Sequence, residues 1–419
     1  MATEVYTNIK YLVNARKHSY LLKGAALAEL PFIEDAYLIV EDGIIAEYGP
    51  MKNFTKDYSI KIDLVGAILP CWCDSHTHLV FAGSREAEFV DKIKGITYAE
   101  IAEKGGGILN SAKKLNDTTA DELFNQAWKR LEDVSKLGTG GIEIKSGYGL
   151  TLEGELKMLR VIKKLKERSS LSIKATFLGA HTYPTQYNKD HQGYIDLIIN
   201  EMLPVIAVEK LADYIDVFCE QGFFSAEETE TICKAGMRYG LKPKLHVNQL
   251  NSIGGIETGI KLNAVSLDHL ETLTENEIEL LSGNKPSLTG KVWRGLCTLL
   301  PTAAFFLRMA LQPARKLIDA GCAIALASDY NPGSSPSGNM NFVISLSCIQ
   351  MKMLPEEAIN AATINGAYAM EMGDELGSIT VGKKANLIFT KSIPSVAYLP
   401  YSFGSNLIDK VMIEGEFIN

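Results

Sequence analysis

Short apolar runs recur through the middle of the chain, and each of them ends in polar or ionisable side chains. Eight such runs lie at 67–78, 140–149, 172–181, 214–220, 242–249, 263–271, 297–303 and 322–332. Helical patterns lie between them, such as 152–168 and 225–240, the second beginning with the capping-box pair Ser225 and Glu228 and ending at Gly240. Strands alternating with helices at this spacing predict an α/β fold, a (β/α)8 TIM-type barrel, and an open doubly wound sheet is the competing arrangement.

The two ends of the chain show a different pattern, in which short alternating segments are separated by glycines. These segments lie at 38–49, 60–68, 376–390 and 407–418. Such alternation is typical of hairpin strands. We therefore expect a small β-sandwich domain built from residues 1–66 and 371–419, beside a barrel that spans residues 67–370.

Composition and charge indicate a globular protein and argue against some classes of partner. The chain has 419 residues, of which 46% are hydrophobic, enough for a large core. Its net charge of −8 argues against nucleic acid or an anionic membrane as the main partner, and no apolar run has the length of a membrane span. The seven cysteines form no CxxC motif, and the first residues lack the apolar core of a signal peptide. We therefore expect a cytoplasmic protein with free thiols.

Histidines at the predicted strand ends are the strongest chemical signal. His76 and His78 occupy alternate positions at the end of one strand, so both imidazoles face the same side. His246 and Asp329 end two further strands, and the carboxyl ends of all strands meet at one face of a barrel. A single histidine in such a place is more often a buried, hydrogen-bonded side chain. Three imidazoles and one carboxylate together suit zinc or iron.

Several motifs along the predicted barrel resemble those of one known family. They are DSHTHLVFAGSREAEF, KGGGI, EIKSGYGL, TFLGAH, DVFCE, HVNQLNSIGG, DHLE and SDYNPGS. The HTH motif is shared by many members of the amidohydrolase superfamily. FAGSREAEF together with KSGYGL and DYNPGS is more specific, and resembles the imidazolonepropionase family of histidine degradation. The resemblance runs from about residue 67 to 370 and continues more weakly to the end.

The resemblance implies a metal-dependent hydrolase that opens the cyclic amide of 4-imidazolone-5-propanoate and yields N-formimidoyl-L-glutamate. It implies one Zn²⁺ or Fe³⁺ ion per subunit, held by His76, His78, His246 and Asp329. The substrate contacts that it implies are Arg85, Tyr98, Tyr148, His181, Gln249, Asn331, Gly333 and Ser334. In this interpretation Asp329 takes a proton from the attacking water, and His269 stabilises the oxyanion or relays a proton. The behaviour of the family also implies a homodimer.

Two other interpretations stay open at this point. A related amidohydrolase acting on another nitrogen heterocycle, as a cyclic amidase or a deaminase, would share the metal ligands. It would not need Arg85, whose planar guanidinium can bind a propanoate through two hydrogen bonds, or Tyr148 beside it. A non-catalytic scaffold on the same fold would need none of the metal ligands.

Three features depart from the family pattern or leave a choice open. Gln249 stands where many members carry Glu, and an amide cannot act as a general base, so that role falls to Asp329 or His269. The segment 280–301 is long and basic, and we expect it to be an insertion near the barrel mouth. Glu220 is either the ligand of a second metal ion or a structural group.

Overall fold

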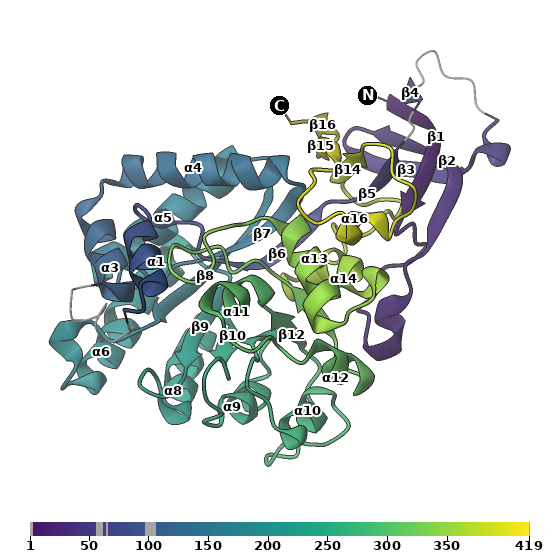
Figure 1. Ribbon diagram of the computed structural model, residues 1–419. Coiled ribbons are helices and arrows are strands. Elements are labelled where there is room, and N and C mark those ends of the chain that lie inside the picture. Colours follow the sequence, from purple (N-terminus) through teal and green to yellow (C-terminus); the bar gives the residue numbers. More distant parts are fainter. Residues whose placement is uncertain (1–2, 56–61, 64–65, 97–105, 419) are drawn as a thin grey trace.

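The computed structural model describes residues 3–55, 62–63, 66–96 and 106–418. Two eight-stranded sheets organise these residues, one entirely parallel and one mixed. Figure 1 shows the parallel sheet surrounded by helices, with the mixed sheet to one side and both chain termini near it. All seven cysteines are free thiols. Among the helices of the described ranges, none combines the length and the apolar character that crossing a membrane requires.

The parallel sheet is the predicted barrel. Its strands are β6 (Trp72–Thr77), β7 (Thr139–Lys145), β8 (Ser172–Ala180), β9 (Tyr214–Cys219), β10 (Lys242–Val247), β11 (Ser266–His269), β12 (Leu296–Leu299) and β13 (Ile324–Leu326). Their order in the sheet is their order in the chain, which excludes the doubly wound arrangement. The first and last strands are joined at their carboxyl ends, where the backbone N–H of Asp329 donates to His76 O at 3.0 Å and that of His78 donates to Tyr330 O at 2.9 Å.

Helices follow most strands and cover the outside of the barrel (Figure 1). The α-helices are α1 (Glu86–Ile93), α3 (Gly107–Asp117), α4 (Ala120–Lys136), α5 (Leu152–Arg168), α6 (His191–Leu197), α7 (Leu203–Glu209), α8 (Ala226–Met237), α9 (Gly255–Leu262), α10 (Glu275–Leu281), α11 (Pro301–Leu307), α12 (Ala314–Asp319), α13 (Met340–Met351), α14 (Pro355–Ala362), α15 (Ile364–Ala369) and α16 (Tyr398–Tyr401). Short 3-10 turns lie at η1 (Gly24–Ala28), η2 (Met51–Asn53) and η3 (Thr185–Tyr187), and η4 (Ile198–Met202) is a π-helical turn.

The two helices expected from the sequence form where predicted. Helix α5 spans Leu152–Arg168, and the Thr151 side chain caps it by accepting from the N–H of Gly154. Ser225 and Glu228 form the predicted capping box of α8. This helix ends at Met237, and Gly240 takes a left-handed conformation a few residues later, with φ of 85°. Local capping chemistry is therefore sufficient to locate these two helices.

The mixed sheet joins both ends of the chain, as the sequence predicts. Its strands are β1 (Thr3–Val13), β2 (Phe32–Glu41), β3 (Ile44–Pro50), β4 (Ile62–Asp63), β5 (Ala67–Pro70), β14 (Leu387–Thr390), β15 (Ile408–Ile413) and β16 (Glu416–Phe417). Strand β5 lies between β1 and β14, so the amino-terminal and carboxyl-terminal strands form one continuous sheet. The apolar run 67–78 thus divides, because β5 pairs in the mixed sheet and β6 begins the barrel after the bend at Cys71. The exact domain boundaries stay a prediction.

Two tight hairpin turns bring the ends of the chain into contact. Asp42 and Gly43 connect β2 to β3, and Glu414 and Gly415 connect β15 to β16. All four residues have positive φ, the conformation of a type I′ turn that matches the twist of the strands. A Cβ on Gly43 would lie 2.4 Å from the carbonyl oxygen of Glu414, so glycine is required for the two turns to pack together.

The segment 280–301 is not an insertion at the barrel mouth, and that expectation is wrong. It contains the end of α10 and the whole of β12, and the residues between them lie at the opposite face. The Trp293 Nε1 donates to Ala264 O at 3.0 Å, just before β11 begins, and Lys291 Nζ donates to Lys261 O at 2.6 Å, near the end of α9. Both partners lie at the amino ends of the barrel strands. A segment between a helix and the next strand runs along this face, opposite the carboxyl ends that form the mouth.

Candidate active site

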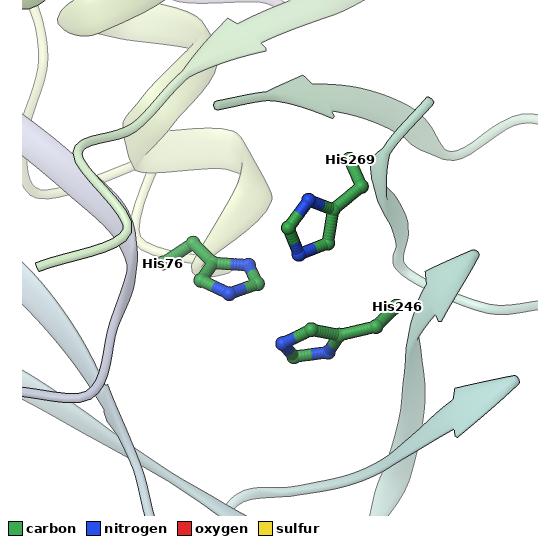
Figure 2. Close-up of side chains that lie close together, drawn as sticks. All are labelled: His76, His246 and His269. Carbon is green, nitrogen blue, oxygen red and sulfur yellow. The ribbon is translucent and has the colours of Figure 1, made fainter. Parts of the chain in front are cut away.

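The predicted metal ligands converge at the carboxyl face of the barrel. The Nε2 atoms of His76 and His78 lie 3.6 and 3.5 Å from Asp329 Oδ1. The Nε2 atom of His246 lies 3.5 Å from Nε2 of His78. Figure 2 shows His76 and His246 pointing toward a common space, with His269 beside them. The ligand atoms of His76, His78 and Asp329 all lie within 4.8 Å of one another, and so do those of His76, His246 and His269, so His76 belongs to both groups.

Two buried carboxylates contact imidazoles of this cluster. Asp268 Oδ2 lies 2.6 Å from Nδ1 of His76, and Asp216 Oδ2 lies 2.9 Å from Nδ1 of His246. Burial lowers the pKa of all three imidazoles, including that of His78, well below the ordinary value, so the rings are neutral. The His76 ring donates its Nδ1 proton to Asp268 and therefore presents the lone pair of Nε2. Nδ1 of His246 lies close to Asp216 Oδ2, but the contact lacks hydrogen-bond geometry.

The donor set fits a divalent metal ion. Zinc bonds of 2.0–2.1 Å in tetrahedral geometry place neighbouring donor atoms roughly 3.3–3.4 Å apart, close to the spacings of 3.5 and 3.6 Å found here. The Nε2 atom of His76 is buried and has no hydrogen-bond partner among the described residues. A buried polar atom without a partner is unfavourable, and a metal ion would satisfy it.

His269 lies beside the cluster in a strained conformation. Its ring centroid is 5.2 Å from that of His246 and 5.8 Å from that of His76, so it can also contribute a nitrogen to a bound ion. Burial opposes its protonation, but the neighbouring carboxylates, led by Glu271, outweigh this and raise the pKa of His269. Glu271 Oε1 lies 3.3 Å from Nδ1. The φ of His269 is 85°, a left-handed value that costs energy for any residue other than glycine.

A cavity of about 430 Å³ opens over the cluster. Seven of the predicted substrate contacts line it, namely Arg85, Tyr148, His181, Gln249, Asn331, Gly333 and Ser334. Tyr98 lies outside the described residues. The sequence did not point to several further lining residues, which are Lys92, Ile108, Phe218, Phe223, Leu250 and Leu307. Phe218 could have been found, because it alternates with Asp216 along a strand whose polar side faces the barrel interior.

Arg85 lines the cavity, and one edge of its guanidinium is hydrogen-bonded to Glu88. Its Nε and Nη2 donate to Glu88 Oε2 at 2.9 and 2.6 Å, and Glu88 Oε1 accepts from the N–H of Gly107. A Cβ on Gly333 would lie 2.1 Å from Nη1 of Arg85. The remaining edge of the guanidinium therefore passes over Gly333, and a larger residue there would force the guanidinium to shift.

A buried glutamate holds the loop that carries Tyr148. Glu155 accepts from the backbone N–H groups of Gly147, Gly149 and Leu150 at 3.1, 2.7 and 3.0 Å. The carbonyl oxygen of Gly147 lies 3.0 Å from Nδ1 of His181. Because a carbonyl can only accept, Nδ1 carries the proton and Nε2 is the acceptor. Burial lowers the pKa of His181 to about 4, so the ring is neutral.

Glu220 holds the next loop along the barrel rim. Its Oε2 accepts from the N–H groups of Leu250 and Asn251 at 2.8 and 3.2 Å, and its Oε1 accepts from Asn251 Nδ2 at 3.0 Å and from the N–H of Gln221 at 2.8 Å. Four donors thus occupy this carboxylate. The structure favours the structural alternative for Glu220, and the loop that it orders carries Gln249.

Asn331 shapes the loop after β13. Its Oδ1 accepts from the N–H groups of Gly333 and Ser334, each at 2.8 Å, and its Nδ2 donates to Asp329 O at 2.6 Å. The hydroxyl of Ser334 lies 3.3 Å from Asp329 Oδ2. The residues predicted to touch substrate in this loop therefore also fix one another and the carboxylate of Asp329.

Fold and site together define a class of protein. A (β/α)8 barrel with histidines and an aspartate gathered at its carboxyl face is the arrangement typical of amidohydrolases, and the Amidohydrolase family profile matches residues 224–418. Guanine deaminase from C. acetobutylicum has the same fold, with a TM-score of 0.70 at 17% identity over 100% of both chains. 5-Methylcytosine deaminase from Klebsiella pneumoniae gives a TM-score of 0.72 at 15% identity over 98% of each chain.

Sequence relatives define the family more narrowly, and the chain belongs to the imidazolonepropionase family. Imidazolonepropionase of Flavobacterium johnsoniae is 58% identical over 98% of both chains. Imidazolonepropionase of Christiangramia forsetii is 54% identical over 99% of this chain and 100% of the relative. The identity extends over nearly the whole length, so it covers the mixed sheet as well as the barrel.

Proposed function

We propose that this chain hydrolyses 4-imidazolone-5-propanoate to N-formimidoyl-L-glutamate, the ring-opening step of histidine degradation. Water adds to the ring carbonyl, the ring C–N bond breaks, and the ring nitrogen leaves with a proton. One observation carries the proposal: a single cavity joins the convergent histidine and aspartate cluster to the Arg85 cation. Family membership at 54–58% identity supports the same substrate.

The proposed cofactor is one zinc or iron ion per subunit. His76, His78, His246 and Asp329 would hold it, through the donor atoms that converge at the carboxyl face. When bound, such an ion supplies Lewis acidity, which polarises a carbonyl and brings the pKa of water from 15.7 toward about 7. We also propose a cytoplasmic homodimer, consistent with the free thiols.

The proton transfers are assigned to Asp329 and His269. Asp329 lies where its carboxylate can take the proton of the attacking water, and the Ser334 hydroxyl lies 3.3 Å from its Oδ2. His269 faces the same cavity, and the carboxylate of Glu271 near its Nδ1 favours the protonated ring. A protonated imidazole can stabilise the developing oxyanion and give a proton to the leaving nitrogen.

The proposed substrate contacts form two groups, one for the propanoate and one for the imidazolone ring. Arg85 binds the propanoate carboxylate through the edge of its guanidinium that Glu88 leaves free. His181 and Gln249 orient the imidazolone ring, His181 as an acceptor at Nε2 and Gln249 through its amide. The remaining proposed contacts are Tyr98, Tyr148, Asn331, Gly333 and Ser334.

The test is incubation with freshly generated imidazolonepropanoate, following the loss of its ultraviolet absorbance, with metal analysis of the same sample. We expect turnover and about one equivalent of metal per chain. His78→Ala should remove most of the metal and nearly all activity, because the cluster loses one of its donors. Guanine serves as the control substrate. A chain that deaminates guanine and leaves imidazolonepropanoate intact would contradict the proposal, as would full activity in metal-free protein.

A further inference from the structure

A layer of ionised side chains lies inside the barrel, where barrels of this kind usually pack branched apolar residues. Glu143 and Lys145 come from β7, Asp216 from β9, Lys244 from β10 and Asp268 from β11, and all five side chains are buried with at most 1% exposed. Burying ions is costly, and a network of this kind is weak support for stability alone. The layer therefore needs an explanation other than packing.

Lys145 connects the carboxylates of this layer to one another. Its Nζ lies 2.7 Å from Glu143 Oε1, 2.8 Å from Asp216 Oδ2 and 3.6 Å from Asp268 Oδ2. Burial alone lowers the pKa of Lys145, but the surrounding carboxylates outweigh burial and raise it, so the side chain is an ammonium ion. One cation thus faces three anions in the barrel interior.

The two aspartates of this network are those that contact Nδ1 of two candidate metal ligands. Asp216 Oδ2, which contacts Lys145, is also the atom 2.9 Å from Nδ1 of His246. Asp268 Oδ2, which faces the same ammonium, is the atom 2.6 Å from Nδ1 of His76. In both cases the same oxygen is shared by the lysine and a histidine. The second oxygen of each aspartate is held elsewhere, since Asp216 Oδ1 accepts from the N–H of His246 at 3.1 Å and Asp268 Oδ1 accepts from the Ser266 hydroxyl at 2.6 Å. Among the described residues, the lysine is thus the one partner that the two histidine-facing oxygens share.

We propose that Lys145 is a positioning residue of the metal centre, which acts through Asp216 and Asp268 to aim Nε2 of His246 and of His76 at one ion. The inference rests on the metal site proposed above and assigns its geometry to a side chain that contacts neither ion nor substrate. Carboxylates hydrogen-bonded to metal-binding histidines fix the tautomer and the ring orientation. Here a single cation lies between one such carboxylate, Asp268, and a second, Asp216, whose Oδ2 lies 2.9 Å from Nδ1 of His246.

Lys244 provides a matched control within the same layer. Its burial equals that of Lys145, and it also pairs with Glu143, through Oε2. Its other hydrogen bonds go to Ala369 O at 3.1 Å and Ser75 O at 3.4 Å. Lys244→Met therefore removes the same charge from the same layer without removing an ion pair to either aspartate.

The experiment measures the metal affinity of the full chain, stripped of metal and titrated with Zn²⁺ against a chromophoric chelator. Lys145→Met should raise the Kd for Zn²⁺ by about 10- to 100-fold, the range for supporting groups of metal-binding histidines. Lys244→Met should change it by less than about threefold. Thermal unfolding of the metal-free variants shows whether both lose similar stability. The visible spectrum of the Co²⁺ form, which reports ligand geometry, should change for Lys145→Met alone.

The outcomes separate this inference from the proposed function. Zn²⁺ affinity of Lys145→Met equal to wild type, or an equal loss in Lys244→Met, overturns the positioning role and leaves the metal site standing. A wild-type chain that binds no metal overturns both. If Lys145→Met does not fold, Lys145→Gln, which keeps a hydrogen-bond donor without the charge, replaces it. That variant should bind Zn²⁺ more weakly than Lys244→Met, and the reverse order overturns the inference.

Discussion

At the scale of single residues, the Arg85 guanidinium lies directly against Gly333, where there is no side chain. The Nη1 atom occupies the space that a Cβ would need, at 2.1 Å. Glu88 fixes the opposite edge of the guanidinium and ties it to the start of α3. The sequence suggested Gly333 as a direct substrate contact, and the structure adds a second reason for glycine at this position.

Removing the Arg85 guanidinium should weaken substrate binding. In Arg85→Ala an ionised propanoate loses its charge-assisted partner, worth roughly 1.5–3 kcal/mol, so KM should rise by about 10- to 150-fold. Arg85→Lys should recover only part of this, because a point charge cannot replace a planar fork. Steady-state kinetics measure both. An unchanged KM in Arg85→Ala would show that the carboxylate binds elsewhere.

Adding a single methyl group at Gly333 should also weaken substrate binding. The new Cβ in Gly333→Ala displaces the guanidinium, so KM should rise in the same direction as in Arg85→Ala. A double variant tests whether the two residues act together. If they do, Gly333→Ala adds little once Arg85 is already alanine. Fully additive effects on KM would mean that Gly333 acts independently of Arg85.

Gln249 and His269 should differ in how they affect the pH dependence of the rate. Gln249→Ala removes no titrating group, so kcat/KM should fall while the shape of its pH profile stays the same. His269→Ala should lower kcat by about 10²-fold or more, the usual effect of losing a positioned acid–base group. The measurement is kcat/KM against pH for both variants. Loss of a pKa in Gln249→Ala, with an intact rate in His269→Ala, would reverse these assignments.

At the scale of elements, the sequence was most informative where the signal is local. Polar residues at the ends of apolar runs located all eight barrel strands, and the capping box located α8. What the sequence could not show were pairings between distant segments. Pro70 marks the point where the run 67–78 divides, because proline cannot donate within a sheet. Which sheet the first part joins is not encoded locally, since the partners of β5 are β1 and β14. The segment 280–301 was misplaced for the same reason.

The ionised layer within the barrel has a signal in the sequence. Glu143 and Lys145 alternate along one strand, and Lys244 alternates with His246 along another, so each pair faces the same side. A polar pair at alternate positions of an otherwise apolar barrel strand indicates the interior. Which carboxylate meets which histidine depends on the closure of the barrel, which no local pattern encodes.

Glu220, at the end of β9, holds the loop after β10 that carries Gln249. In Glu220→Gln, an NH₂ group takes the place of one carboxylate oxygen, so only one oxygen is left to accept from four N–H donors. The loop that carries Gln249 should therefore become more mobile. We expect kcat/KM to fall by about tenfold or more, from the loss of one charge-assisted hydrogen bond. Bound metal, measured by elemental analysis, should not change. Loss of a metal equivalent would instead favour Glu220 as the ligand of a second ion.

At the scale of the whole molecule, three of the four candidate metal ligands lie at the seam where the barrel closes. His76 and His78 belong to the end of the first strand, and Asp329 follows the last. The backbones already meet there, through the hydrogen bonds of Asp329 with His76 and of His78 with Tyr330. An ion held by side chains from both sides of this seam would join segments separated by some 250 residues of chain.

Metal removal should therefore destabilise the barrel and not only stop catalysis. An ion that binds only the folded chain stabilises it by about 4 kcal/mol when present at 1,000 times its Kd. Chelation should lower the Tm of the wild-type chain by a few degrees or more in scanning calorimetry, and re-addition of Zn²⁺ should restore it. His78→Ala is the control, because its metal affinity is already lost and its Tm should barely respond to the chelator.

Hydrogen exchange locates the effect, since the amides of His78 and Asp329 at the seam should exchange faster after chelation. If chelation changes neither the Tm nor the exchange rate of these amides, closure of the barrel does not depend on the ion.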